Sequence, residues 1–434
     1  MSGNVVNNGI ITTQDGAVGD VLTIAGDYSG TGALNVDIDT SMDTGDTIAI
    51  AGNSSGTTLI TTTNLTPAVA TGNDITVVTV GGTSTAGDFA LAGGPVTAGA
   101  FDYGLEYQAG SFVLAAVVNS TGSVYQAAPF ALVDSVSNMP TLEQRVGQRQ
   151  WNSAGGNAAP ETGEWLRITG DWSEAALDSG IALESNTWGI QAGFDLGVER
   201  GDNGQWVLGM TAQTGQSSTA ITTATGSGSI DTQSMGFGGT ATWYGDDALY
   251  VDLQGQVNWI SADYASSAAG SLAEGELARS VSASAEVGKR FALDENSGLT
   301  PQAQLTWSQL EGGAFTDSAG NAVDLGTTER LTGRVGLAYD HEWKGDSGTS
   351  NNVYAIVNVL HDFDSASSVD VAGASLTDSR EATSGEIGFG GTIAWDDASS
   401  ALNTELYGEA SYRQSFASSD NNALAATAGI RIQW

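Results

Sequence analysis

The sequence predicts an all-β protein, in which residues 163–434 form an antiparallel transmembrane β-barrel of about twelve strands, preceded by a short right-handed β-helix. The composition is the first observation, because 59 of 434 residues are glycine and only 15% are charged, which is typical of β proteins. The second observation is an alternation of apolar and polar residues from Glu164 onward. The third is a loose repeat within residues 19–85.

The charge and the residue types exclude several kinds of partner and site. The formal net charge is −37, so the phosphates of a nucleic acid would be repelled and no nucleic-acid partner is expected. The absence of cysteine excludes disulfides, zinc–thiolate sites and cysteine nucleophiles. No run of about 18 apolar residues occurs, so no membrane-spanning helix is predicted. We expect neither a cofactor nor a metal.

The N-terminal repeat predicts a stack of parallel strands. GDVLTIAGDYSGTG (19–32), GDTIAIAGNSSGTT (45–58) and GNDITVVTVGGTST (72–85) each contain Gly, then Asp or Asn, then an apolar alternation and a Gly-rich turn. Their spacing of roughly 26 residues fits the coils of a β-helix. The coils lack the closely spaced Gly-Gly-x-Gly-x-Asp repeats that bind calcium. The side chains expected to fill the core are Leu22, Ile24, Ile48, Ile50, Ile75 and Val77.

The end of the stack and a change in charge define three parts. GAFDYGLEYQAGSFVLAAV (99–117) predicts a terminal hairpin that caps the coils. No basic residue precedes Arg145, where the sequence pattern also changes. We therefore expect the end of a β-helix with its cap at 1–120, a linker at 121–162 and the barrel at 163–434. The first residues, MSGNVVNNGIITTQDG, do not resemble a signal peptide, which favours a chain that is part of a longer protein.

The linker contains a predicted helix. Its apolar residues recur at helical spacing, Asn138 can cap a helix, and Pro140 suits a first turn, so the helix is expected at about 139–149. It would display Arg145 and Arg149 four residues apart. Two interpretations stay open: a solvated linker helix, or a helix inside the pore whose guanidinium groups face acidic walls.

The alternation in the last part assigns a face to each side chain. In ALYVDLQGQVNWIS (248–261), apolar residues such as Leu253 and Trp259 oppose polar residues such as Asp252 and Asn258. Segments of about 12–16 residues are too long for an ordinary sandwich. Aromatic residues near segment ends predict interface girdles: Trp165, Trp172, Trp188, Trp206, Trp243, Trp343, Trp395 and Trp434. The inward face carries charges that a dry core could not hold: Arg167, Glu286, Arg334, Glu386, Glu405 and Glu409.

The count of segments is even, as bacterial barrels of one chain require. The segments begin near 164, 187, 205, 231, 248, 279, 299, 329, 352, 382, 401 and 422. Short connections follow the second, sixth and tenth, whereas 263–278 and 313–328 predict long loops, so the two sides match periplasm and cell exterior. The last segment alternates strictly to Trp434 and is expected to close the sheet against the first strand, which leaves no open edge in lipid.

With these features in order, the chain resembles an autotransporter of the type V secretion family. GDYSGTGALNVDI and AGAFDYGLEYQAGSFVLA are similar to the last coils and the autochaperone region of a passenger β-helix, and 163–434 is similar to a translocator domain. The resemblance implies a barrel in the outer membrane that serves secretion or surface display of its own N-terminal passenger, with the helix left in the pore.

The resemblance also implies partners and an assembly signal. The partners would be outer-membrane lipid, periplasmic chaperones and the barrel assembly machinery, which would read the terminal Trp434 with Ile432 and Ile430. Some members cleave an Asn-Asn junction in the pore helix. Asn138 is followed here by Met139, so self-cleavage is not carried over.

Catalysis is not expected, and two alternatives to a translocator are kept. A nucleophilic site needs a serine, a base and an acid within hydrogen-bond reach. The GDSG at 345–348 places Ser347 in a Gly/Ser-rich loop, and His361 beside Asp362 lacks a second acidic pair. The alternatives are a porin with an unrelated N-terminal cap and an outer-membrane barrel hydrolase.

Overall fold

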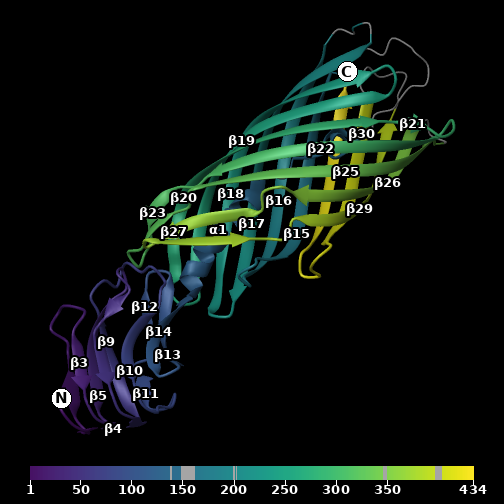
Figure 1. Ribbon diagram of the computed structural model, residues 1–434. Helices are drawn as coiled ribbons and strands as arrows, with labels where there is room; N and C mark the ends of the chain where they lie inside the picture. Colours follow the sequence, from purple (N-terminus) through teal and green to yellow (C-terminus); the bar gives the residue numbers. More distant parts are fainter. Residues whose placement is uncertain (137–138, 148–161, 199–200, 202, 346–348, 396–402) are drawn as a thin grey trace.

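The computed structural model describes the whole chain except residues 137–138, 148–161, 199–200, 202, 346–348 and 396–402. A β-helix forms the N-terminal part and lies beyond one end of a tall barrel, and the C-terminus lies at the opposite end of that barrel (Figure 1). Within the described part of the chain, no helix is both long and apolar enough to cross a membrane.

The β-helix consists of three parallel sheets, one on each side of its coils. The side chains predicted for its core are buried, except that Leu22 is only partly covered. The first sheet contains β1 (Val5–Asn7), β4 (Tyr28–Gly30) and β8 (Ser54–Gly56). The second contains β3 (Val21–Ile24), β7 (Thr47–Ile50) and β10 (Ile75–Val80). The third contains β2 (Ile10–Thr12), β5 (Ala33–Asp39), β9 (Thr58–Asn64) and β11 (Phe89–Leu91), with the short β6 (Thr44–Gly45) beside β5.

An antiparallel cap ends the stack, as the hairpin at 99–117 predicts. β13 (Phe101–Gln108) and β14 (Ser111–Val118) form the hairpin, and β12 (Val96–Ala98) pairs with β13. β14 also pairs antiparallel with β10, which occupies the edge that a further parallel coil would need. Tyr103 and Leu114 are fully buried, whereas Tyr107 is exposed at the rim.

The predicted position of the helix at 139–149 is wrong for the main helix of the linker. The main helix is α1 (Ser120–Val136), which Asn119 caps by accepting a hydrogen bond from the Gly122 N–H at 2.8 Å. Fifteen of its 17 residues are buried, so α1 has no solvent-exposed face and its sequence shows no amphipathic period. Pro129 in its interior further hides it from sequence-based prediction.

Only a short helix falls in the predicted range. It is α2 (Leu142–Val146), capped by Thr141 rather than by Asn138. Thr141 and Gln144 form a reciprocal capping box, which sets the start of α2 at Leu142. Asn138 and Arg149 lie outside the described residues.

Twelve long strands of the described chain form a closed antiparallel barrel, because β31 pairs with β15 and β20 pairs with β22. Most begin within a few residues of their predicted starts; β16, β18 and β20 begin earlier, at 182, 226 and 270. The strands are β15 (Gly163–Ala176), β16 (Ala182–Gly197), β17 (Gly204–Thr223), β18 (Gly226–Gly245), β19 (Leu249–Ser266), β20 (Gly270–Lys289), β22 (Ser297–Glu311), β25 (Thr327–Lys344), β26 (Thr349–Asp362), β29 (Thr383–Trp395), β30 (Asn403–Ser415) and β31 (Asn422–Gln433), with the short β21 (Phe291–Ala292) beside β22.

The strand ends near the β-helix differ from the prediction in one place. The long loop expected at 263–278 is wrong, because β19 and β20 extend through most of it and leave a turn at 267–269. The connection at 313–328 is long and contains β23 (Ala314–Thr316) and β24 (Ala322–Asp324). These two strands join β27 (Ala366–Val371) and β28 (Ala374–Ser379) in a separate four-stranded sheet.

The two faces of the barrel follow the predicted alternation. Leu253 and Trp259 are exposed on the outside, whereas Asp252 and Asn258 are buried in the lumen. Trp165 is a correction: it was predicted to lie in a girdle, but it is buried in the lumen against Leu142 and Val146. Side chains of a strand alternate between its two faces, and Trp165 is two residues before Arg167 on β15, so both lie on the inner face.

Candidate functional site: the linker inside the barrel

The helix α1 occupies the half of the lumen that faces the β-helix. It contacts β17, β18 and β19 on one side and β27 and β28 on another. This half of the lumen is apolar rather than charged, since Ile221, Ile230 and Ile260 are buried with α1 in the same core cluster as the β-helix interior. A continuous apolar core therefore connects the β-helix, α1 and the barrel wall.

Asp134, in the last turn of α1, is held by two arginines of the barrel. Its carboxylate lies 2.7 Å from Arg330 Nη1 and 2.6 Å from Arg380 Nη1. Asp362 lies on the other side of these guanidinium groups, 2.7 Å from Arg330 Nη2 and 3.9 Å from Arg380 Nη2. The two carboxylates balance the two guanidinium charges in a partly buried network, which fixes the end of α1 to β25 and to the segment after β28.

Glutamines on the inner face bind the backbone between the two helices. The Gln256 Nε2 donates to the Val136 carbonyl at 3.1 Å. The Gln254 Nε2 donates to the Pro140 carbonyl at 2.8 Å, and Gln304 reaches the same carbonyl at 3.3 Å. These amides satisfy carbonyl groups that have left helical hydrogen bonding inside a closed space.

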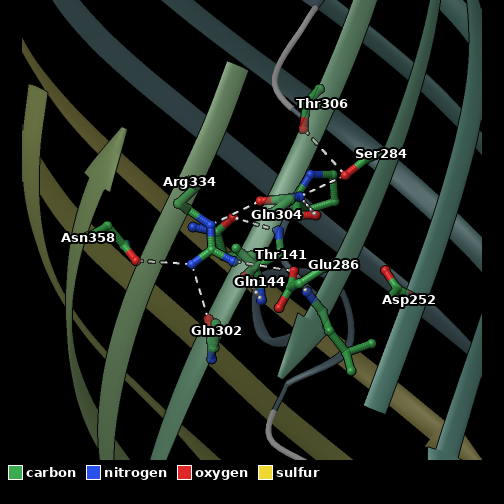
Figure 2. A network of polar contacts seen from close by, with 12 residues as sticks. Thr141, Gln144, Asp252, Ser284, Glu286, Gln302, Gln304, Thr306, Arg334 and Asn358 are labelled. Atoms are coloured by element: carbon green, nitrogen blue, oxygen red, sulfur yellow. Dashed lines mark hydrogen bonds and ion pairs between the residues drawn. The ribbon is translucent and has the colours of Figure 1, made fainter. Parts of the chain in front are cut away.

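The first turn of α2 meets a carboxylate of the wall. The Leu142 N–H donates to Glu286 Oε2 at 3.1 Å, and the Tyr250 hydroxyl donates to Glu286 Oε1 at 2.6 Å. A negative charge at the amino end of a helix is electrostatically favourable. Figure 2 shows Glu286 beside Thr141 and Gln144, with Arg334 opposite.

Arg334 organises the wall around Glu286. Its guanidinium donates to Gln304 at 3.0 Å, to Gln302 at 3.1 Å and to Asn358 at 3.0 Å, and its Nη2 lies 3.5 Å from Glu286 (Figure 2). Because Gln304 accepts from Arg334 through its oxygen, its amide nitrogen faces away from Arg334 and donates to Ser284 and to the Pro140 carbonyl of the linker. Arg334 thus orients both a carboxylate and an amide toward the linker.

Arg145 is almost completely buried inside the barrel. Its side chain is about 2% exposed and lies 2.6 Å from Asp252 and 3.8 Å from Asp195. Thr242 also accepts from it at 3.0 Å, and the Tyr407 hydroxyl donates to its carbonyl oxygen at 2.5 Å. The position agrees with the pore interpretation of the linker, in which the guanidinium faces acidic walls.

The other predicted lumen charges also lie on the inner face, and Glu409 contacts the described part of the linker. Glu409 accepts from Gln144 at 2.7 Å and from Tyr354 at 2.6 Å. Arg167 donates to the Gln191 amide oxygen at 2.8 Å. The remaining two contact wall arginines: Glu386 lies 3.1 Å from Arg413, and Glu405 lies 3.7 Å from Arg431.

Sequence reasoning missed several residues that hold the linker. Asp134, Gln254 and Thr141 were not selected, because the helix was placed downstream and neutral amides carry no charge signal. The inward parity of Gln254 and its neighbour Asp252 was the one available clue, since both were assigned to the polar face of their segment. Which wall residue meets which linker atom depends on the depth at which the linker sits.

The predicted assembly residues close the barrel at its far end. β31 pairs with β15 along twelve residues, and the Trp434 N–H donates to the Thr162 carbonyl at 3.2 Å. The Trp434 ring lies 6.2 Å from that of Phe194 on β16. Ile430 and Ile432 lie on the same outer side of β31 and line an apolar groove with Leu166.

The candidate catalytic residues do not form a site among the described residues. His361 is exposed and its Nδ1 lies 2.8 Å from the Thr383 hydroxyl. Its neighbour Asp362 points to the opposite face of β26, toward Arg330. Ser347 lies outside the described residues.

Two family models match this chain. Residues 165–402 match the autotransporter β-domain, and residues 3–105 match the autochaperone domain type 1. The adhesin BmaC autotransporter of Brucella suis is 30% identical over 480 residues, which cover 100% of this chain and 14% of that protein. The uncharacterized protein YuaQ of Escherichia coli is 28% identical over 411 residues, which cover 83% of this chain and 29% of that protein. The chain thus spans less than a third of the length of either relative.

Two solved structures share the fold. The transport unit of the autotransporter AIDA-I from Escherichia coli superimposes with a TM-score of 0.57 at 18% identity, over 73% of this chain and 100% of that one. The translocator domain of NalP from Neisseria meningitidis gives a TM-score of 0.53 at 14% identity, over 72% and 99%.

The barrel is closed and its outer face is apolar. Its lumen holds the described part of the segment between the N-terminal β-helix and the first strand. These features define a translocator of the bacterial outer membrane. The chain belongs to the autotransporter family, because the β-domain model matches more than half of it. It is an outer-membrane translocator for its own passenger, which is displayed at the cell surface.

Proposed function

We propose that the structure represents the barrel after export, with the linker retained as a plug and the passenger still attached. The path of the chain is the observation that carries this proposal. From the β-helix at one mouth, the chain runs through α1 and α2 inside the lumen, and β15 begins at the other mouth (Figure 1). A chain that left through the barrel would occupy this path when its last exported residue had passed.

The contacts of α1 and α2 support a plug rather than a loose linker. The apolar half of the lumen packs against α1, and the polar half binds α2 through Asp252, Glu286 and Glu409. Such paired and buried charges resist removal, because breaking one buried pair costs about 3–5 kcal/mol. The lumen charges act in this proposal as anchors and not as acid–base catalysts.

Residues 1–118 serve as the base of a longer passenger, whose own activity lies outside this chain; the similar BmaC protein is named an adhesin. The barrel assembly machinery recognises the end of β31 at Trp434, Ile432 and Ile430, after periplasmic chaperones have delivered the chain. The barrel itself catalyses no reaction.

Single-channel recording in planar bilayers tests the plug. We expect the intact chain to show low conductance and a variant lacking residues 130–150 to show a large, stable conductance, since that deletion removes α2 and the end of α1. The matched control is the deletion of residues 418–420, which shortens the connection between β30 and β31 and leaves α1, α2 and the outer sheet in place. High conductance in the intact chain would favour the porin alternative.

The hydrolase alternative has a separate test. Esterase and protease activity would be measured for the purified chain and for Ser347→Ala and His361→Ala. We expect no activity above the detergent blank in any of the three. Activity in the intact chain that disappears in either variant would overturn the non-catalytic proposal.

A further inference from the structure

The two long outer connections of the barrel form one folded unit, which we call the outer sheet: β23, β24, β27 and β28. Each strand exposes one face and buries the other. The exposed face is polar, with Ser368, Asp370, Ser375 and Thr377. The buried face is apolar and belongs to the continuous core described above: Val323, Leu325, Val369, Val371 and Leu376.

The outer sheet is fastened to the rim of the barrel at two separate places. At one end, the Asp178 N–H donates to the Ser379 carbonyl at 2.9 Å, and the Ser179 N–H donates to Asp378 at 3.1 Å. At the other end, the Ser318 N–H donates to the Leu272 carbonyl at 2.8 Å. The first place is the turn between β15 and β16, and the second is the start of β20, so the sheet extends across part of the mouth.

The buried face of the outer sheet lies on α1. The Gln126 Nε2 donates to the Thr377 carbonyl at 3.2 Å, and the Tyr125 hydroxyl donates to Asp317 at 3.2 Å. The Tyr125 ring also packs against Phe315 of β23, at 5.9 Å between ring centroids. At the end of α1, Asp134 binds Arg380, the residue that directly follows β28.

The turn of the outer sheet contacts the base of the passenger. Between β27 and β28, Ala372 has a φ of 53° and accepts a hydrogen bond from the Ala70 N–H at 3.2 Å. A Cβ atom added to Gly99 would lie 2.7 Å from the Ala372 Cβ, so the cap also sits tightly on this turn. Ala70 and Gly99 both belong to the part of the β-helix that lies next to the barrel.

We propose that the outer sheet is a docking surface for two segments of this chain, α1 and the passenger base at 69–72 and 98–100, and closes over the mouth only when α1 is seated. This inference rests on the proposed function, since it requires a stage at which the passenger still fills the pore. Without α1, the apolar face of the sheet would be exposed to water, and Arg330 and Arg380 would share one carboxylate, Asp362. Both conditions disfavour the closed position until Asp134 arrives.

Hydrogen exchange of the purified full chain in detergent tests the dependence on α1. In Asp134→Asn, we expect amide exchange in β27 and β28 to become faster by about tenfold, because the partly buried ion pairs of Asp134 with Arg330 and Arg380 are lost. The control is Arg413→Gln, which breaks a lumen ion pair with Glu386 but touches no part of the outer sheet. Exchange that stays unchanged in Asp134→Asn would overturn the proposal.

A second variant tests the order of events and does not depend on a destabilised sheet. The chain contains no cysteine, so Ser179→Cys with Asp378→Cys forms the only possible disulfide, at a pair of side chains in direct contact. We expect this disulfide to form while surface display of the N-terminal part stays at the wild-type level. If the disulfide forms and surface display of the N-terminal part is abolished, the outer sheet closes before export, and the proposal is overturned.

The outcomes separate this inference from the plug itself. If the intact chain conducts strongly, the proposed function fails, whatever the exchange rates are. If Asp134→Asn conducts more but the exchange of β27 and β28 is unchanged, the plug stands and the docking surface fails.

Discussion

Arg145 combines the first positive charge of the chain with one of its most completely buried side chains. Asp252 and Asp195 are its anionic partners, and each faces the lumen because it lies at an inward position of a β-strand. At this scale, the alternation of a strand decides which charges can meet the linker. The contact itself fixes the depth of α2 in the barrel.

Arg145→Met tests this contact. We expect the free energy that holds α2 in the lumen to fall by about 3–5 kcal/mol, because Asp252 stays buried without its cation. Amide exchange of residues 142–146 measures the loss. The double variant Arg145→Met with Asp252→Leu should recover much of the protection, since it removes both charges; equal exchange in the single and double variants would contradict the assignment.

The β-helix offers a test by pH at Asp39. The Ser41 hydroxyl, at 2.6 Å, is the main cause that holds the pKa of Asp39 below its ordinary value of 3.8, and Thr66 adds a second hydroxyl at 2.7 Å. A lowered pKa contributes stability that is present above the ordinary value and is lost as the pH falls through the folded value.

We therefore expect Asp39→Asn to destabilise the β-helix at pH 7 by about 1–2 kcal/mol and to have a smaller effect at pH 2, because the stability that the ionised carboxylate contributes is lost as the pH falls through its folded pKa. Exchange of the amides of β5 at the two pH values, corrected for intrinsic rates, is the measurement. A variant that is equally destabilised at both pH values would show that the hydrogen bonds and not the charge matter.

At the scale of the elements, inward-facing residues of neighbouring barrel strands are complementary in size, so that a large side chain on one strand lies over a small one on the next. Trp165 of β15 lies against Gly193 of β16, where an added Cβ would come within 2.3 Å of the indole ring. The indole packs beside Leu142 and Val146 of α2, and the absence of a side chain at Gly193 leaves room for it there. A sequence pattern of apolar and polar residues does not record this fit.

Gly193→Ala is expected to displace the indole of Trp165 and to destabilise the folded barrel by about 1–3 kcal/mol, as overpacking usually does. The temperature at which the folded band disappears in heat-modifiability gels reports the change. Gly104→Ala in the cap is the matched control, since nothing lies within 4 Å of the added Cβ. Similar midpoints for both variants would contradict the tight fit at Gly193.

The whole molecule is asymmetric. The wall from β17 to β20 has strands of 18 to 20 residues, whereas β29 to β31 have 12 or 13. At about 3.3 Å per residue, the first wall is longer by roughly 20 Å. α1 lies against this tall wall, and the outer sheet faces it from the other side. Closure of the barrel between β15 and β31 holds the two walls together.

Deletion of Trp434 tests that closure. We expect the amount of folded barrel in membranes to fall at least about tenfold, because the last strand loses the residue that ends its pairing and contacts Phe194. The control is Trp259→Ala, which removes an exposed aromatic side chain from the middle of the outer face. Equal losses, measured by heat-modifiable mobility, would remove any special role for the terminus.

The sequence by itself determined the strand number, the closing pair and the inward face of the barrel. Each depends on the alternation of apolar and polar residues along single strands, which can be read directly from the sequence. Asp252, Glu286 and Arg334 were placed on the inner face in this way. The repeat of Gly–Asp turns likewise determined the β-helix and its cap.

Only the tertiary structure decided where the linker is helical, what surrounds it and how the outer connections fold. A helix enclosed on all sides, such as α1, has no solvent-exposed face, so no period marks it in the sequence. Trp165, Gly193 and Arg380 acquire their roles from residues far away along the chain. Their contacts exist because the barrel closes around the linker, and closure is a property of the whole sheet.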